Sequence, residues 1–306
     1  MAVSTVKVTI SGQTYNLTYN STSGKWEKTI IAPSITSFKQ SGGYYGVQVQ
    51  ATDDAGNTTT KDQTDATLGP SLRLTVKETT KPTISISSPS SGAKITSASP
   101  TIQFNLRDEA NGSGIKISSL ALKIDGGSAI GNTATGMTCT EVTNGYDCTY
   151  VCQSALSEGS HTITIDIQDN DGNTATTSST TFSVDTVPPT LNISNPVDGL
   201  KTNNANLTVS GTTNDTTSSS VTVTIKLNGA DQGVVTVTDG SFSKAITLAQ
   251  GSNTIVVRST DSAGKYSEIT RTVTLDTTAP TISAVTITPN PVDGGATFAI
   301  SVTVSD

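Results

Sequence analysis

Three segments of the chain share one pattern, in which an alternating apolar run leads into an acidic turn with glycine and then a polar run. They are VQATDDAGNTTT at 49–60, IDIQDNDGNTAT at 165–176 and VRSTDSAGKYSE at 257–268. Glycine adopts left-handed backbone angles, and Asp side chains accept hydrogen bonds from their own backbone, so both favour turns. The repetition predicts similar structural units that share one late hairpin.

A proline-bearing linker follows each turn after about one strand. The linkers are KPTISISSP at 81–89, PPTLNISNPVDG at 188–199 and APTISAVTITPNPVDGG at 279–295. Pro82 and Pro189 are 107 residues apart, and Pro189 and Pro280 are 91 apart, which are the lengths of whole domains. The predicted modules are therefore 1–80, 81–187 and 188–278, followed by an incomplete fourth module at 279–306.

Apolar residues alternate with Thr, Ser, Asn or Lys along many short runs, as in IQFNL at 102–106 and VTVTIKL at 221–227. This period of two, with one buried face and one solvent-exposed face, is typical of antiparallel sheets. Hydrophobic residues make up 33% of the chain and aromatic residues 4%, which suits short strands better than a helical core. About seven strands per module predict an all-β chain of tandem immunoglobulin-like β-sandwich modules in an extended rod.

Composition also excludes several classes of function. A net charge of −7 without a basic cluster predicts no nucleic-acid binding, which needs Lys and Arg to neutralise phosphates. The N-terminus shows no signal peptide and no apolar run reaches about 18 residues, so we expect a cytoplasmically made chain without membrane insertion. One histidine, His161, and no nucleophile motif predict that the chain is not an enzyme. We expect no cofactor other than calcium.

The acidic turns are the candidate metal sites. Asp166, Asp169 and Asp171 lie close together in the second turn, and Asp185 lies at a module junction, where Asp276 is its counterpart. Closely spaced carboxylates suit Ca²⁺. The complete calcium-loop signature needs further acidic ligands downstream, and these are absent, so a purely turn-forming role is the competing interpretation.

Three cysteines, Cys139, Cys148 and Cys152, fall within 14 residues. A two-residue turn at Asn144-Gly145 would set Glu141 opposite Cys148, with Cys139 diagonal to it. A Cys139–Cys148 disulfide would then need a bulge to adjust the register. Free thiols and a zinc site remain as alternatives, although zinc lacks a fourth ligand.

Aromatic residues concentrate in the first module. We expect them to form its core, and Tyr15, Tyr19, Tyr44 and Tyr45 alternatively to form a face for a glycan or a protein partner.

The C-terminal segment 296–306 aligns by position with 205–215, the second strand of the third module. Two strands cannot bury an apolar face by themselves. Phe298, Ile300, Val302 and Val304 would therefore pack against the third module, pair with another chain by strand exchange, or be exposed because the chain is cut here.

The repeated hairpins, together with DTVPPTLNISNPVDG at 185–199 and DTTAPTISAV at 276–285, resemble those of bacterial Ig-like repeat proteins. The opening MAVSTVKVTISGQTYNLTYNSTSGKWEKTI and the stretch GMTCTEVTNGYDCTY at 136–150 are similar to Ig-like proteins encoded in tail-gene regions of phages and prophages of gut Firmicutes. The resemblance implies a non-enzymatic structural or adhesive virion protein, associated with the tail or decorating the particle. Its partners would be other virion proteins, further copies of itself as an oligomer, or a host-surface glycan. The alternatives are a segment of a bacterial cell-surface adhesin and a filament subunit that assembles through its C-terminal strands.

Overall fold

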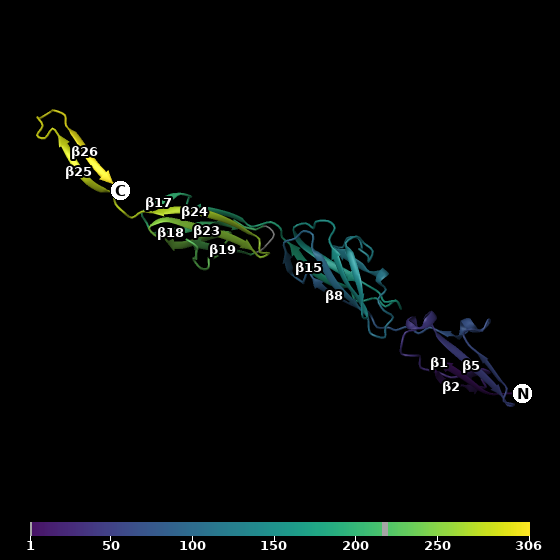
Figure 1. The fold of residues 1–306 in the computed structure, drawn as a ribbon. Helices are drawn as coiled ribbons and strands as arrows, with labels where there is room; N and C mark the ends of the chain where they lie inside the picture. The colour runs from purple at the N-terminus through teal and green to yellow at the C-terminus, as the bar shows by residue number, and fades with distance from the viewer. Residues whose placement is uncertain (1, 216–219) are drawn as a thin grey trace. The chain divides into compact units, whose positions relative to one another are not determined.

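The computed structural model describes residues 2–215 and 220–306 and consists of β-sheets with a few short 3₁₀ helices, as Figure 1 shows. The chain divides into two compact units, residues 1–184 and 185–306. The predicted all-β fold of tandem immunoglobulin-like sandwich modules is confirmed, and the second and third modules are the sandwiches. Within the described residues, no helix has the length and apolar character needed to cross a membrane.

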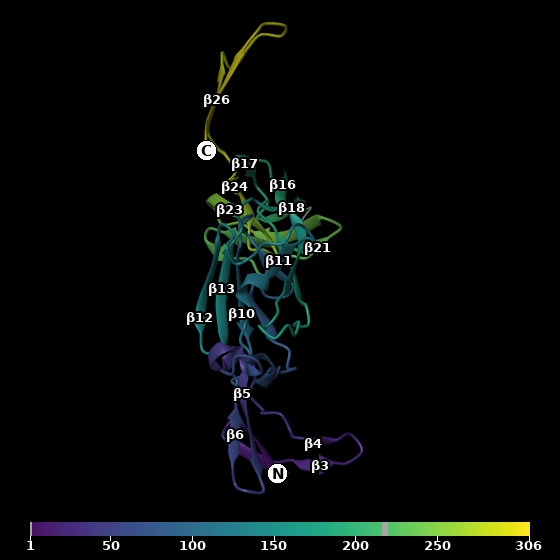
Figure 2. The same cartoon turned by 90° about the vertical axis from the view of Figure 1, so that its right-hand side faces the viewer.

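The first module consists of one main sheet and a separate small hairpin (Figure 2). The main sheet has the order β2-β1-β5-β6, with β7 also paired to β5. Its strands are β1 (Val3–Ile10), β2 (Gln13–Asn16), β5 (Tyr45–Asp53), β6 (Thr58–Lys61) and β7 (Arg73–Leu74). The hairpin pairs β3 (Thr18–Asn20) with β4 (Lys25–Glu27), and the helices are η1 (Ser37–Lys39), η2 (Ser41–Gly43) and η3 (Gly69–Leu72).

The first module differs from the expected sandwich. Val6 and Tyr45 are its buried hydrophobic residues in the described part of the chain. The segment 28–44, which includes Pro33, forms no strand that could cover the inner face of β1 and β5. The predicted aromatic core is therefore wrong for most of its members, because a single sheet offers them no opposing layer.

The second module is a sandwich of two four-stranded sheets, β12-β13-β10-β8 and β11-β14-β15-β9. Along β10, Ile102, Phe104 and Leu106 point inward while the residues between them are less buried, as the alternation predicts. The strands are β8 (Thr83–Ser88), β9 (Ala93–Ile95), β10 (Thr101–Arg107), β11 (Ala121–Ile124), β12 (Met137–Val142), β13 (Gly145–Val151), β14 (Gly159–Asp166) and β15 (Ser178–Val184), with the helix η4 (Ile117–Ser119).

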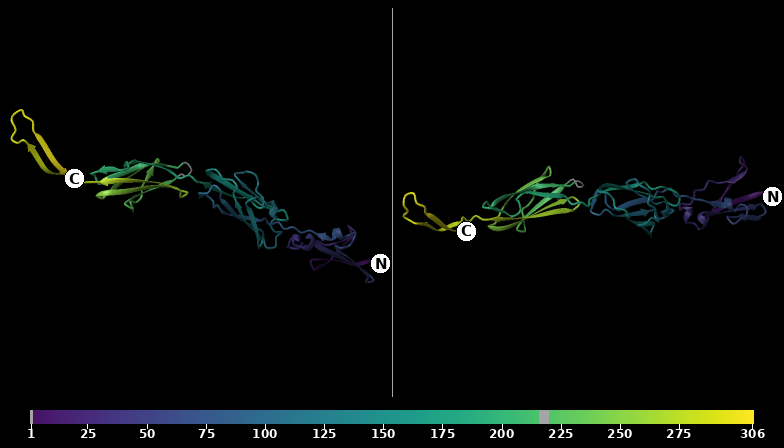
Figure 3. Two further views of the ribbon diagram at one scale, coloured as in Figure 1. Left: turned by 45° about the horizontal axis from the view of Figure 1, so that its top comes forward. Right: turned by 90° about the horizontal axis from the view of Figure 1, so that it is seen from above.

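The third module has the same design, with sheets β16-β18-β22-β21 and β17-β24-β23-β19-β20 (Figure 3). Val209, Ile225, Ile255 and Val257 are fully buried between the sheets. The strands are β16 (Thr190–Asn195), β17 (Leu200–Thr202), β18 (Asn206–Asn214), β19 (Val221–Leu227), β20 (Ala230–Asp231), β21 (Val237–Thr238), β22 (Ser241–Thr247), β23 (Gly251–Asp261) and β24 (Tyr266–Leu275).

The C-terminal segment forms a two-stranded antiparallel hairpin of β25 (Thr281–Thr288) and β26 (Ala299–Ser305). All residues of both strands are exposed. The side chains predicted to need cover are about half exposed, namely Phe298, Ile300, Val302 and Val304. Packing of these residues against the third module, one of the three expectations, is therefore not what the structure shows.

Candidate functional site

The acidic turns are built in the same way in all three modules. The first Asp of each turn accepts two backbone N–H groups with its Oδ1, at donor–acceptor distances between 2.6 and 2.9 Å. The turn glycine adopts a left-handed φ of 88°, 97° or 91°, which a side chain would strain. The residues are Asp53 with Gly56, Asp169 with Gly172, and Asp261 with Gly264. One carboxylate oxygen of each Asp is therefore used to fold the hairpin.

In the second module, the turn residue Asp169 lies close to two further acidic residues, Glu78 and Asp108. We call these three residues the first triad. One carboxylate oxygen of each lies within 4.8 Å of the others. Glu78 comes from the linker before β8, Asp108 directly follows β10, and Asp169 lies between β14 and β15. Asp169 is fully buried and Asp108 is 8% exposed. Residues far apart in the sequence thus place three carboxyl groups at one end of the sandwich.

Negative charge is unfavourable in the first triad. Burial, together with a proton shared with Asp169, raises the pKa of Glu78 to about 7. Burial and the neighbouring Glu109 carboxyl raise the pKa of Asp108 to about 6. Burial acts in the same direction on Asp169, but hydrogen bonds from Glu78 and Asn173 outweigh it and lower the pKa of Asp169. Protons therefore compensate part of the charge at this site near neutral pH.

The third module repeats the cluster with Asp185, Asp215 and Asp261, the second triad. One oxygen of each again lies within 4.8 Å of the others. Asp185 stands four residues before Pro189, as Glu78 stands four before Pro82, and Asp215 follows β18 as Asp108 follows β10. Asp185 is 1% exposed and Asp261 is 6% exposed. Both triads therefore join a linker acid, a strand-end acid and a turn acid.

The linker at the first triad is hydrogen-bonded into the second module. Asp171 accepts the Glu78 N–H at 3.1 Å and also the Thr36 hydroxyl of the first module. Asn173 Nδ2 donates to the Glu78 carbonyl at 3.1 Å. These bonds fix the backbone of Glu78 next to the acidic turn.

Of the four predicted calcium ligands, the structure brings Asp169 and Asp185 into triads, in different modules. Asp166 accepts a hydrogen bond from the Thr177 hydroxyl on the strand side, and Asp171 binds the linker. Four triad members were not predicted as ligands from the sequence, namely Glu78, Asp108, Asp215 and Asp261. The four-residue distance from the linker acid to its proline, which Glu78 shares with Asp185, could have found Glu78.

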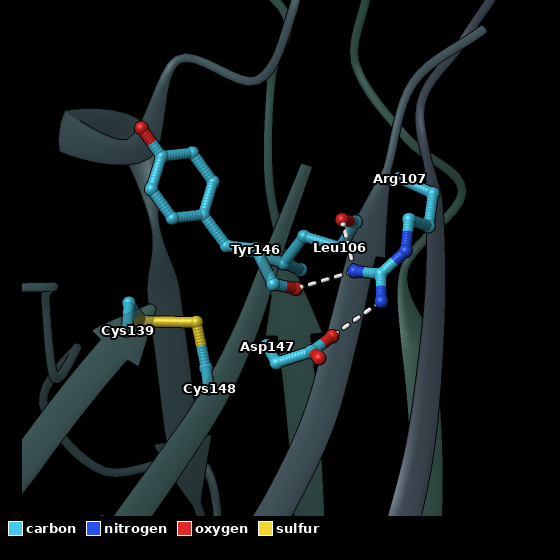
Figure 4. Close-up of a disulfide and its surroundings, with 6 residues drawn as sticks. All are labelled: Leu106, Arg107, Cys139, Tyr146, Asp147 and Cys148. Atoms are coloured by element: carbon cyan, nitrogen blue, oxygen red, sulfur yellow. Dashed lines mark hydrogen bonds and ion pairs between the residues drawn. A yellow bond between two sulfur atoms is a disulfide. The ribbon is translucent and has the colours of Figure 1, made fainter. Parts of the chain in front are cut away.

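Cys139 and Cys148 form a disulfide between neighbouring strands, shown in Figure 4. The predicted register is wrong, because Cys139 lies directly opposite Cys148 and Glu141 lies opposite Tyr146. Asn144 takes the left-handed turn position with φ 59°, and Gly145 already pairs with Arg107 of β10. A Cβ at Gly145 would lie 1.9 Å from the Leu106 carbonyl oxygen. The glycine is needed for close strand contact and not for the turn.

Arg107 and Cys152 lie close to this hairpin. Arg107 forms an ion pair with Asp147 and donates to the carbonyl oxygens of Leu106 and Tyr146 at 2.9 and 2.7 Å (Figure 4). Cys152 is a buried free thiol whose pKa is raised by burial.

The four tyrosines predicted as one contact face lie in different settings. Tyr15 and Tyr45 line a groove of about 680 Å³ in the first module, together with Lys28, Ile30 and Leu74. Tyr45 is itself buried, and its hydroxyl donates to the Ile35 carbonyl at 3.0 Å. Tyr19 contacts Trp26 on the small hairpin, and Arg73 lies over the Tyr44 ring. Of the four tyrosines, only Tyr15 and Tyr45 therefore line a concave surface in the described part of the chain.

His161, the one histidine, is buried beside Phe182. Its Nδ1 lies 2.7 Å from Asp125 Oδ2 and its Nε2 lies 2.9 Å from the Ser157 carbonyl oxygen. Burial lowers the pKa of His161, but these partners outweigh it and raise the pKa overall. The arrangement orients a strand-end side chain.

We expect NMR titration of the single imidazole to give a pKa above the ordinary value of about 6.5, and Asp125→Asn to bring the pKa down. A raised folded-state pKa stabilises the module below the unfolded pKa, and this stabilisation is lost as the pH rises through the folded value. A wild-type pKa at or below 6.5, or one unchanged in the variant, would contradict the assigned pair.

The fold is that of a chain with tandem immunoglobulin-like modules. Residues 82–165 match the family model of the bacterial Ig domain, and residues 189–277 match that of glucodextranase domain B. Each match lies within one module.

A curated relative is bacillopeptidase F of Bacillus subtilis, 34% identical over 137 residues. The match covers 45% of this chain and 9% of that protein. Among solved structures, an I-band fragment of titin, I67–I69, is 12% identical, with 89% of this chain and 87% of that chain covered and a TM-score of 0.45. Fibronectin(III)-like modules of Clostridium thermocellum CbhA are 16% identical, with 63% and 94% covered and a TM-score of 0.38.

Proposed function

We propose that this chain is a non-enzymatic structural or adhesive protein of a phage virion, associated with the tail or decorating the particle. The observation that carries the structural role is the bonded linker between the first two modules. Glu78 and Asp171 are held together by a backbone hydrogen bond, and Thr36 from the first module joins the same carboxylate. Such a linker supports a chain that positions modules rather than one that transforms a substrate.

The likeness of the first 30 residues and of the cysteine hairpin to tail-region Ig-like proteins supports the virion assignment. The chain would then be made in the bacterial cytoplasm and released with the particle. Its contacts would be with other virion proteins, with further copies of itself, or with a glycan of the host surface. The groove lined by Tyr15 and Tyr45 is the surface we assign to such a contact.

Negative-stain microscopy of purified phage particles, labelled with an antibody against residues 1–80, tests this function. We expect label at a defined position on the particle, most simply the tail. In a matched sample, in which the antibody is first incubated with the purified chain, the particles should carry no label. Unlabelled particles combined with label on the bacterial envelope would replace the virion assignment with that of a cell-surface adhesin segment.

A further inference from the structure

We propose that each acidic triad binds one calcium ion, so that the chain takes up two. This inference does not depend on the virion assignment. The first site comprises Glu78, Asp108 and Asp169, and the second comprises Asp185, Asp215 and Asp261.

The geometry of the triads suits a hard cation of this size. Calcium binds carboxylate oxygens at about 2.3–2.6 Å, so two ligands on opposite sides of the ion are about 4.6–5.2 Å apart. The oxygens of each triad lie within 4.8 Å of one another. Every side-chain ligand is a carboxylate, whereas zinc favours His and Cys. Magnesium, at about 2.0–2.1 Å, demands a tighter octahedron and usually retains water.

Two buried oxygens provide evidence that is independent of the clustering. Asp108 Oδ1 and Asp261 Oδ2 are buried and have no hydrogen-bond partner in the part of the chain that the structure describes. Both residues are more than nine-tenths buried. A buried, unpartnered carboxylate oxygen is costly, and a bound cation would supply the missing interaction.

The second oxygen of the same residues is already committed to the fold. Asp261 uses Oδ1 to accept the turn N–H groups, and Asp108 uses Oδ2 to accept the Gly114 N–H at 2.6 Å. Each triad therefore contains one acid that uses one oxygen for the local backbone and leaves its other oxygen without a hydrogen-bond partner among the described residues. For the first triad, no ion pair to Lys or Arg occurs among residues 2–215 and 220–306.

The position of the sites predicts what calcium does. Glu78 and Asp185 come from linkers, while the other ligands come from a strand end and a turn of the following module. A bound ion would tie each linker to that end of its module. Because the unfolded chain does not preassemble the ligands, calcium should raise the melting temperature of both units.

Isothermal titration of the chelator-treated full chain with CaCl₂ tests the proposal, with an expected stoichiometry of two. Asp108→Asn should remove the first site and Asp215→Asn the second, so that each variant binds one ion per chain instead of two. Asn retains the acceptor for the Gly114 N–H and resembles the protonated acid, so we expect Asp108→Asn to fold. Asp53→Asn is the matched control, since Asp53 forms the same turn outside either triad, and it should leave two ions bound.

Circular dichroism would verify the fold of each variant. If Asp108→Asn does not fold, Glu78→Gln in the linker tests the same site. Calcium should raise the melting temperature of both units in the wild type. In Asp108→Asn it should raise the melting temperature of the unit of residues 185–306 only. The absence of binding up to about 10 mM CaCl₂, above the range of extracellular calcium modules, would overturn the proposal. So would two ions retained in the folded triad variants, or equal affinity for MgCl₂.

Discussion

Replacing Phe104 by alanine is expected to lower the free energy of unfolding of the second module by about 3–5 kcal/mol. Phe104 is fully buried in the middle of β10, between the two sheets of the sandwich. Truncation removes the ring from the core and leaves a cavity that neighbouring strands, fixed by their hydrogen bonds, can fill only in part. Because whole domains are stable by about 5–15 kcal/mol, this is a large part of the total. Denaturant unfolding of the full chain would measure this loss of stability in the transition of the unit of residues 1–184.

Two phenylalanines provide matched controls. Phe298, in the C-terminal hairpin segment, is 51% exposed, and its replacement by alanine should change stability by no more than about 0.5 kcal/mol. Phe242 is 3% exposed in the third module, so Phe242→Ala should destabilise the unit of residues 185–306 instead. A Phe104→Ala variant that unfolds like the wild type would contradict the assigned core.

The core of the two sandwiches could be predicted because burial on one face imposes a period of two. Ile102, Phe104 and Leu106 were predicted as one inward face of a strand, and the structure buries all three. Val223 and Ile225 follow the same rule in the third module. Such a pattern is local, and it survives whichever strand becomes the neighbour.

The hairpin register could not be obtained in this way. Asn-Gly is a strong signal for a two-residue turn, but Gly145 serves the contact with β10, which lies far earlier in the chain. The turn therefore lies one position earlier than predicted, at Thr143-Asn144, and Cys139 lies directly opposite Cys148. The cause is a strand–strand contact that the segment itself does not encode.

The triads show the same limit. The DNDG stretch suggested that its own neighbouring aspartates share a metal, because those are adjacent in sequence. In the fold, Asp169 instead meets Glu78 and Asp108, which arrive from the linker and from β10. Their proximity depends on which strands pair and where each strand ends. The sequence offered a clue only to Glu78, because the linker acids Glu78 and Asp185 both stand four residues before a proline.

Breaking the Cys139–Cys148 disulfide is expected to destabilise the first unit by about 2–3 kcal/mol. The bridge closes a loop between cysteines nine positions apart. In the chain-entropy description, opening such a loop frees the unfolded chain by about this amount. Thermal unfolding of the full chain with and without a phosphine reductant would measure the effect. The unit of residues 185–306 contains no cysteine and serves as an internal reference, whose transition should not move.

Two cysteine variants assign the effect to the bond. Cys139→Ala should be destabilised without reductant and insensitive to it. Cys152→Ala keeps the bridge, so it should still respond to the reductant, even though loss of its buried thiol costs some packing. If Cys139→Ala still responded to reductant, the reducible bond would involve another cysteine pair. The β12–β13 register, with Cys139 facing Cys148, would then be wrong as well.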